Sequence, residues 1–228
     1  MTGSPISPLR DPAVHAVIER VKGGGRSGRS GADRGAGGGG QGRPGAGGHN
    51  ARAGRDPFDF AERAFPVDPE QGDLMYLLCR ASGATRVAEF ATSLGVSTLY
   101  LTAAVRDNGG GLVIGSEIVP AKAAAARANL AEANLGGFAD IRVGDVLETF
   151  SDLGGPIDFL LVDGWPIGRE PSLARSVIEM VAPQLRPGAF VFNDNAEADY
   201  LEYVRDPANG LLGMSLPLKG GTELSVRI

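Results

Sequence analysis

From residue 86 onwards, short apolar runs alternate with longer stretches in which apolar residues recur at helical spacing. The first apolar run, residues 87–90, predicts a strand. A turn of small residues, a helix and a second strand that ends on Glu117 follow it. A strand, a tight turn, a helix and a second strand make half of a nucleotide-binding βαβ unit. The rest of the chain is organised around this stretch.

Three more parallel strands are predicted downstream. They cover residues 140–143, the run IDFLLVD that ends on Asp163, and the run AFVFND that ends on Asp194 and Asn195. The last two are nearly continuous apolar runs, which is typical of parallel strands buried on both faces. In the tail, two alternating runs joined by residues 219–221 predict an antiparallel hairpin. The predicted fold class is α/β, a doubly wound, mostly parallel Rossmann-like sheet with a C-terminal antiparallel hairpin.

Four more helices are expected around these strands. They are a helix over 57–65, one that begins at Pro69, an alanine-rich one that begins at Pro120 and stops at Gly136 and Gly137, and one over 171–185 that stops at 186–188. The second of them takes Asp68 as its N-cap. Its apolar face is expected to contain Leu74, Leu77 and Leu78.

The N-terminal part divides in two. Residues 12–22 fit a short amphipathic helix with Val14 and Ile18 on its apolar side. Residues 23–55 contain 15 glycines in 33 positions and almost nothing apolar, so burial cannot offset the entropy lost on ordering. We expect this Gly/Arg-rich segment to be disordered and residues 56–228 to form the functional domain. The arginines leave contact with RNA or DNA open beside an inert linker.

Composition fits a globular chain in the cytoplasm. The 228 residues are 43% hydrophobic and 21% charged, with a formal net charge of −5, and we do not expect a nucleic-acid partner. No apolar run approaches the roughly 18 residues of a membrane span, and no signal-peptide core follows the first residues, so no membrane partner is expected. The single cysteine rules out an internal disulfide, and both histidines precede residue 56. A histidine base and an ordinary zinc site are therefore not expected in the domain.

The spacing between the turn and the acid indicates the ligand. Glu117 lies 22 residues after Gly95. An acid about 20 residues past a glycine turn accepts hydrogen bonds from the hydroxyls of an unphosphorylated ribose. The turn has neither the GxGxxG of dinucleotide folds nor the GxxxxGK of a P-loop. The ligand should carry a free ribose.

The pattern E-x-A-x-x-x-G-x-S, which begins at Glu89, resembles motif I of the class I S-adenosylmethionine-dependent methyltransferases, in their catechol and caffeoyl-CoA O-methyltransferase group. The resemblance extends over residues 56–228 and implies S-adenosylmethionine as the cofactor. The cofactor-binding positions that it implies are Val67, Glu89, Ala91, Ser93, Gly95, Ser97, Glu117, Asp145, Val146 and Asp163. Ala91 stands where the family has glycine, and its Cβ costs roughly 1 kcal/mol or more if φ is positive there. Asp145 is also a good N-cap for the helix after it.

Several of the predicted strands end on an acid. Open α/β sheets bind their ligands next to the carboxyl ends of the strands. Taken singly, each acid fits equally well as a cap of the following helix. In the resemblance, Asp163, Asp194 and Asn195 match the metal-ligand set of the catechol-type enzymes, and their oxygen donors suit Mg²⁺ or another divalent cation. Asp163 is thereby implied as a catalytic residue. Trp165 matches a wall of the acceptor pocket, and Pro166 stands where the family has a lysine.

The resemblance implies an enzyme that transfers the methyl group of S-adenosylmethionine to a hydroxyl of a small, phenolic or catechol-like acceptor, with assistance from a divalent metal. Two alternatives stay open. One is a metal-independent methyltransferase on the same fold, and the other is a cofactor-binding protein that has lost catalysis. Relatives in this group are commonly dimers, so a homodimer is compatible with the resemblance.

Overall fold

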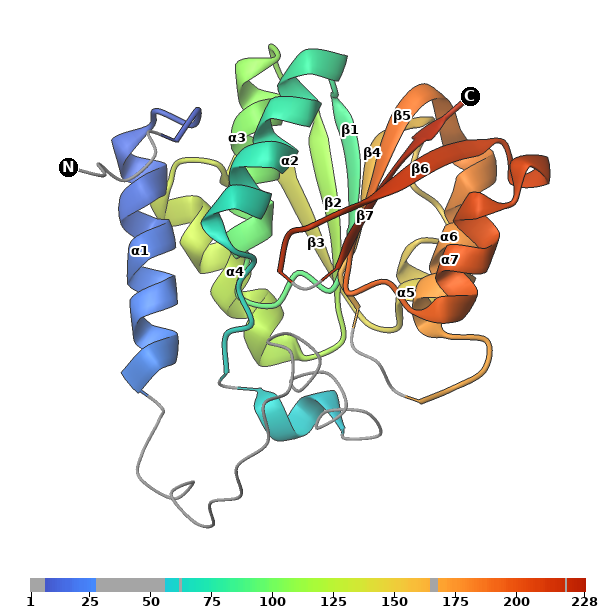
Figure 1. Ribbon diagram of the computed structural model, residues 1–228. Coiled ribbons are helices and arrows are strands. Elements are labelled where there is room, and N and C mark those ends of the chain that lie inside the picture. Colours follow the sequence, from blue (N-terminus) through green and yellow to red (C-terminus); the bar gives the residue numbers. More distant parts are fainter. Residues whose placement is uncertain (1–6, 28–55, 62, 165–167, 220) are drawn as a thin grey trace, which may run out of the picture.

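The computed structural model describes residues 7–27, 56–61, 63–164, 168–219 and 221–228. Its centre is a seven-stranded sheet with the order β3-β2-β1-β4-β5-β7-β6 (Figure 1). The strands are β1 (Arg86–Phe90), β2 (Leu112–Glu117), β3 (Ala139–Val143), β4 (Ile157–Val162), β5 (Leu185–Asp194), β6 (Leu211–Leu216) and β7 (Thr222–Arg227). Strands β1 to β5 are parallel, and β7 runs antiparallel between β5 and β6. The predicted fold class and the C-terminal hairpin are confirmed.

Helices cover both faces of the sheet, with α1 to α4 on one side and α5 to α7 on the other (Figure 1). The α-helices are α1 (Pro12–Ser27), α2 (Pro69–Ser82), α3 (Val96–Asp107), α4 (Pro120–Glu132), α5 (Val146–Thr149), α6 (Leu173–Val181) and α7 (Ala198–Arg205). The 3₁₀ turns are η1 (Pro57–Phe60), η2 (Gly136–Phe138), η3 (Ala182–Gln184) and η4 (Pro207–Asn209). Each side has its own cluster of buried apolar side chains against the sheet, as a doubly wound fold requires.

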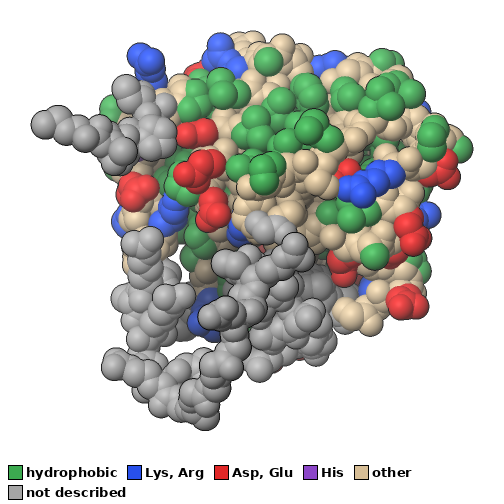
Figure 2. Space-filling view, in the orientation of Figure 1, with side chains coloured by type: hydrophobic (Ala, Val, Ile, Leu, Met, Phe, Trp, Pro, Cys, Tyr) green, Lys and Arg blue, Asp and Glu red, His purple; other side chains and the backbone are tan. Residues whose placement is uncertain are grey.

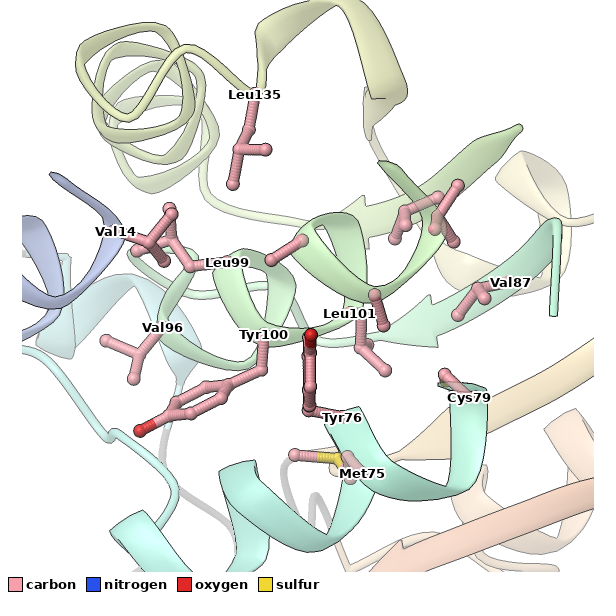
Figure 3. Close-up of a cluster of buried hydrophobic side chains, with 14 of the residues drawn as sticks. Val14, Met75, Tyr76, Cys79, Val87, Val96, Leu99, Tyr100, Leu101 and Leu135 are labelled. Carbon is pink, nitrogen blue, oxygen red and sulfur yellow. The ribbon is translucent and has the colours of Figure 1, made fainter. Parts of the chain in front are cut away.

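Helix α2 packs closely on α3, and the contact orients its N-terminus toward the sheet ends. A Cβ on Gly72 would lie 2.4 Å from the ring of Tyr100, so only glycine permits this approach. Figure 3 shows Met75 and Cys79 of α2 facing α3 across the same layer. The predicted apolar face was wrong for Leu77, which is 49% exposed.

That error has a simple cause. The buried positions of α2 include Gln71, Gly72 and Met75, because a polar side chain and a glycine occupy the inner face. Leu74 and Leu78 are only partly buried at its border. The spacing of apolar residues therefore predicts the wrong face of the helix as the buried one.

Helix α1 is part of the core. Val14 and Ile18 are fully buried, and Val14 lies beside Leu99 of α3 (Figure 3). Arg106 Nη1 binds Asp11 Oδ2 at 2.6 Å, which ties the start of α1 to α3. The helix expected over 12–22 is confirmed and continues to Ser27. The boundary at residue 56 therefore cuts between α1 and the layer on which it packs, and residues 28–55 lie outside the described ranges.

Three helix boundaries differ from expectation. The helix expected over 57–65 is only the 3₁₀ turn η1. Helix α4 ends before the two glycines, because Asn134 with φ 57° already takes the left-handed position that stops it. Residues 186–188 belong to β5, where Gly188 with φ 80° sits in a register shift against β4.

The part of the chain that the structure describes has no helix long and apolar enough to cross a membrane. Figure 2 shows hydrophobic side chains gathered over the upper part of one face, where α2 and β6 lie in Figure 1. Large exposed hydrophobic residues on these two elements are Leu77, Leu212 and Met214.

Candidate active site

The turn after β1 has three residues in the left-handed region. Ala91, Ser93 and Gly95 have φ values of 71°, 52° and 84°. The amides of Ala91 and Thr92 both donate to the carbonyl of Ser116, at 3.0 and 3.1 Å, and hold the turn against β2. Ala91 therefore adopts the conformation that favours glycine, and its Cβ carries a strain of about 1 kcal/mol.

Glu117 ends β2 and is fixed toward this turn. Its Oε2 accepts a hydrogen bond from the amide of Ser93 at 2.7 Å, and its Oε1 accepts one from the amide of Val119 at 2.9 Å. The residue is only 6% exposed. Each carboxylate oxygen keeps a second lone pair, so Glu117 can receive two ligand hydroxyls without breaking these bonds.

A buried lysine lies behind Glu117. Burial lowers the pKa of Lys122, and the charge of Glu117 opposes this shift. The Lys122 Nζ lies 5.1 Å from the ring centroid of Phe65. The ammonium thus neutralises part of the charge that Glu117 brings into the site. The sequence interpretation missed Lys122, because a single lysine in an alanine-rich helix gives no signal.

Glu89 supports the turn from beneath. It is fully buried, and its Oε2 accepts from Thr92 Oγ1 at 3.0 Å and from Thr98 Oγ1 at 2.5 Å. Burial raises the pKa of Glu89 although these hydroxyls oppose the rise. Its Oε1 has no partner among the described residues. The contacts give Glu89 a clear role in holding the turn, while its predicted contact with the cofactor stays a prediction.

A small hollow, partly open to solvent, lies beside the turn. Its lining residues are Ala64, Phe65, Pro66, Ala91, Thr92, Ser93, Leu94, Val96, Ser97 and Asp163. Four of the predicted cofactor positions, Ala91, Ser93, Ser97 and Asp163, therefore meet in one place. Phe65 and Pro66 were not predicted for the site, since they come from an irregular segment before α2.

The other predicted cofactor positions lie around the hollow rather than in its wall. Gly95 ends the turn as the residue before α3, and Val67 is 2% exposed in the core. Asp145 caps α5, with its Oδ1 accepting from the amide of Leu147 at 2.8 Å. Val146 beside it is buried. The capping role expected for Asp145 is thus present, and the adenine contact expected for both residues stays a prediction.

Two acids meet at the ends of β4 and β5. Val162, the last residue of β4, pairs with Asn193 of β5. The residues that follow, Asp163 and Asp194, therefore lie side by side. Burial and the neighbouring Asp194 raise the pKa of Asp163 well above its ordinary range, and Lys219 opposes this rise. The N-caps of α6 and α7 are Ser172 and Glu197. The alternative that these acids merely cap the following helices is therefore wrong.

Both oxygens of Asp194 have partners from distant parts of the chain. Gln71 Nε2 donates to Oδ1 at 2.8 Å, and Lys219 Nζ donates to Oδ2 at 2.6 Å. Gln71 also accepts from the amide of Asp68 at 3.1 Å and donates to Thr222 Oγ1 at 3.0 Å. The N-terminus of α2 is thereby fastened to β5 and β7. A D-x-x-Q spacing predicts the cap but cannot reveal the bond to Asp194.

The predicted metal ligands are not arranged as an open cation site. An ammonium already occupies Asp194, whereas the buried Oδ1 of Asn195, a residue with φ 67°, has no partner in the described part of the chain. Within the same ranges no three His, Cys, Asp or Glu side chains gather as metal ligands, but this count does not include Asn195. The ammonium, and not Asn195, is the feature that does not fit a divalent cation next to Asp194. Trp165 and Pro166 lie outside the described residues.

Several known proteins resemble this chain in sequence. Residues 88–196 match the family described as "Methyltransferase domain". A catechol O-methyltransferase of Mycobacterium tuberculosis is 33% identical over 130 residues, which are 57% of this chain and 56% of that protein. The chain thus aligns with just over half the length of this curated relative.

Solved structures extend the likeness to the fold. The cofactor-bound Rv0187 from MTB has a TM-score of 0.60 and 26% identity, with 74% of this chain and 84% of that chain covered. An O-methyltransferase from Bacillus cereus in complex with SAH has a TM-score of 0.65 and 18% identity over 93% of this chain and 91% of that one, and shows the same fold. The turn after β1, the acid at the end of β2 and these relatives all agree with a likeness to the S-adenosylmethionine-dependent methyltransferases of the catechol O-methyltransferase type.

Proposed function

We propose that this chain transfers the methyl group of S-adenosylmethionine to a hydroxyl of a small, phenolic or catechol-like acceptor. The observation that carries the proposal is the bond between the Ser93 amide and Glu117, 2.7 Å long, at the rim of the hollow that ends at Asp163. This bond holds the Glu117 carboxylate, which can accept hydrogen bonds from ribose hydroxyls, next to the small side chains of the turn. The relatives named catechol O-methyltransferase support the acceptor class.

The chain's own groups have separable roles in this reaction. Glu117 would receive the ribose hydroxyls, and the small residues of the turn would let the ligand approach the backbone. The cofactor supplies an activated methyl group on a sulfonium. The remaining task of the protein is to align the acceptor oxygen with that methyl group and to exclude water. Asp163, in the wall of the hollow, marks the end at which the acceptor would enter.

Metal assistance at Asp163, Asp194 and Asn195, which the resemblance implies, stays a prediction. The bond from Lys219 to Asp194 argues against it and favours the metal-independent alternative. An ammonium at this place repels a second cation and already neutralises one of the two acids.

Calorimetry with S-adenosylmethionine tests the proposal directly, followed by transfer of a labelled methyl group to a panel of catechols, simple phenols, amines and carboxylic acids. We expect saturable binding at one site and methylation of a phenolic oxygen. Binding without transfer to any acceptor would favour the protein that has lost catalysis, and absence of binding would refute the cofactor assignment.

A further inference from the structure

Lys219 reaches the acid pair from the turn of the C-terminal hairpin. Its backbone has φ 43°, in the left-handed region, which costs a residue with a Cβ some stability. Its side chain is 27% exposed, and the side chain of Asp194 is 0% exposed. The N–O distance of 2.6 Å is short for a charge-assisted hydrogen bond. A flexible lysine is therefore held in one place beside a pair of acids, of which Asp194 is buried and Asp163 is half-buried.

The surroundings of Lys219 are strongly negative. Asp194 binds its ammonium, and the negative charges of Asp163 and Asp68 favour its protonated form. The charge of Glu89 in turn helps to raise the pKa of Asp163. Asp163 also lines the hollow beside the cofactor turn. One cation thus stands where these two acids would otherwise repel each other, at the side of the hollow where an acceptor would meet the cofactor. An ammonium has three N–H donors, and within the described residues Lys219 donates a hydrogen bond to Asp194 alone.

We propose that Lys219 is the resident cation of the acceptor site, that it takes the place of a divalent metal, and that its ammonium receives the acceptor oxygen as an oxyanion. The part that concerns the acceptor rests on the proposed function. The part that concerns the cation does not, because it follows from the contacts of Asp194 alone.

The transfer step then needs no metal. The acceptor, a phenol acidic enough to ionise, loses its proton to water and docks with its oxyanion against the Lys219 ammonium. The oxygen's electron pair forms the new bond to the methyl carbon while the carbon–sulfur bond breaks. That bonding pair stays on sulfur, and the sulfonium becomes a neutral thioether. Lys219 remains protonated throughout and keeps its bond to Asp194.

Thermal unfolding with excess Mg²⁺ or with EDTA tests the cation assignment without any activity. The unchanged protein should show no shift in melting temperature with Mg²⁺. Lys219→Gly removes the ammonium and the backbone strain together, and leaves Asp163 and Asp194 free for a cation. Its melting temperature should rise by about 4 °C in Mg²⁺. Lys22→Met, on α1, is the matched control and should behave like the unchanged protein.

Two further variants make the assignment decisive. Lys219→Gly combined with Asp194→Asn should lose the response to Mg²⁺. Lys219→Met should bind S-adenosylmethionine as the unchanged protein does, with at least a tenfold loss of kcat/KM for an acidic phenol, and EDTA should leave transfer by the unchanged protein intact. Stabilisation of the unchanged protein by Mg²⁺, or loss of its transfer in EDTA, would overturn the proposal. Failure to bind S-adenosylmethionine would instead refute the proposed function and leave the cation result standing.

Discussion

Two strand-end acids near the hollow are held differently. Beside the turn proposed to bind the cofactor, which we call the cofactor end, Glu117 binds the amides of Ser93 and Val119, which lie 24 and 2 residues away. Where the acceptor is proposed to bind, which we call the acceptor end, Asp194 binds Gln71, 123 residues away, and Lys219 from the hairpin. Backbone groups fix the first acid, whereas side chains of distant elements fix the second.

This difference has a functional meaning. Backbone amides are fixed once the strand and turn form, so the cofactor end depends on chain conformation and tolerates changes in most side chains. The acceptor end depends on one ammonium and one amide side chain, and a single substitution can change its charge. Within one fold, the acceptor chemistry can therefore vary while the cofactor site stays the same.

The largest effect is expected from α1, which packs on α3 and α4. Its buried side chains include Val14, Val17, Ile18 and Val21, and each contributes about 1.5 to 3 kcal/mol. Deletion of residues 1–27 should therefore remove several kcal/mol of a stability that is itself only about 5 to 15 kcal/mol. Circular dichroism should show a large fall in melting temperature.

Residues 28–55 provide the contrast. Replacing them with a Gly/Ser sequence of equal length should change neither the melting temperature nor cofactor binding, because they contain almost nothing apolar. If the deletion of 1–27 is as harmless as this replacement, the packing of α1 contributes nothing, and the domain begins at residue 56 as its composition suggested.

The same contrast explains what the sequence could predict. The first two strands, the turn and Glu117 follow from local apolar runs, small residues and a spacing, all of which lie within the 32 residues 86–117. The fold class and the family followed from them. The place of Ala91 in the left-handed region was also predictable, since it occupies the position of a family glycine.

The acceptor end could not be predicted in the same way. Lys219 looked like an ordinary hairpin residue, and nothing in the sequence singled out Gln71 as a partner of Asp194. Their meeting at Asp194 depends on how α2 packs on α3 through Gly72 and on how β7 pairs with β5. These contacts are tertiary, and no local pattern records them. The metal prediction depended on the three oxygen donors alone and so missed the lysine.

Glu117→Gln should have the next largest effect. It removes the charge that strengthens the bonds to the ribose hydroxyls, and each such bond contributes about 1.5 to 3 kcal/mol. The dissociation constant of S-adenosylmethionine should rise at least tenfold by calorimetry. The melting temperature should also fall, because the amides of Ser93 and Val119 lose their charged partner. Glu202→Gln, exposed on α7, should change neither quantity, and an unchanged affinity in Glu117→Gln would remove the ribose assignment.

Ala91→Gly should have a smaller effect of the opposite sign. The change relieves the strain at φ 71°, while glycine gains entropy in the unfolded chain. The entropy cost of about 0.4 to 1 kcal/mol offsets much of the relieved strain, so we expect a net gain of up to about 0.5 kcal/mol in the free energy of unfolding, measured by urea denaturation. Ala124→Gly, at an exposed position inside α4, is the matched control and should lose about 1 kcal/mol. Equal losses in both variants would show that the turn is not strained.

The smallest effect concerns the dependence of stability on pH. Burial raises the pKa of Glu89 in the folded protein above its ordinary value of 4.5, so the folded state holds this proton more tightly than the unfolded chain does. The stability from this group is complete below pH 4.5 and is lost as the pH rises through the raised pKa. Glu89→Gln cannot titrate at this position and does not lose this stability. As the pH rises, the melting temperature of the variant should therefore increase relative to that of the unchanged protein. Asp163 titrates in both proteins and largely cancels in the difference, and Glu19→Gln, exposed on α1, should give a nearly flat difference. A difference for Glu89→Gln that is equally flat would mean that Glu89 stays ionised beneath the turn, and that Thr92 and Thr98 compensate fully for its burial.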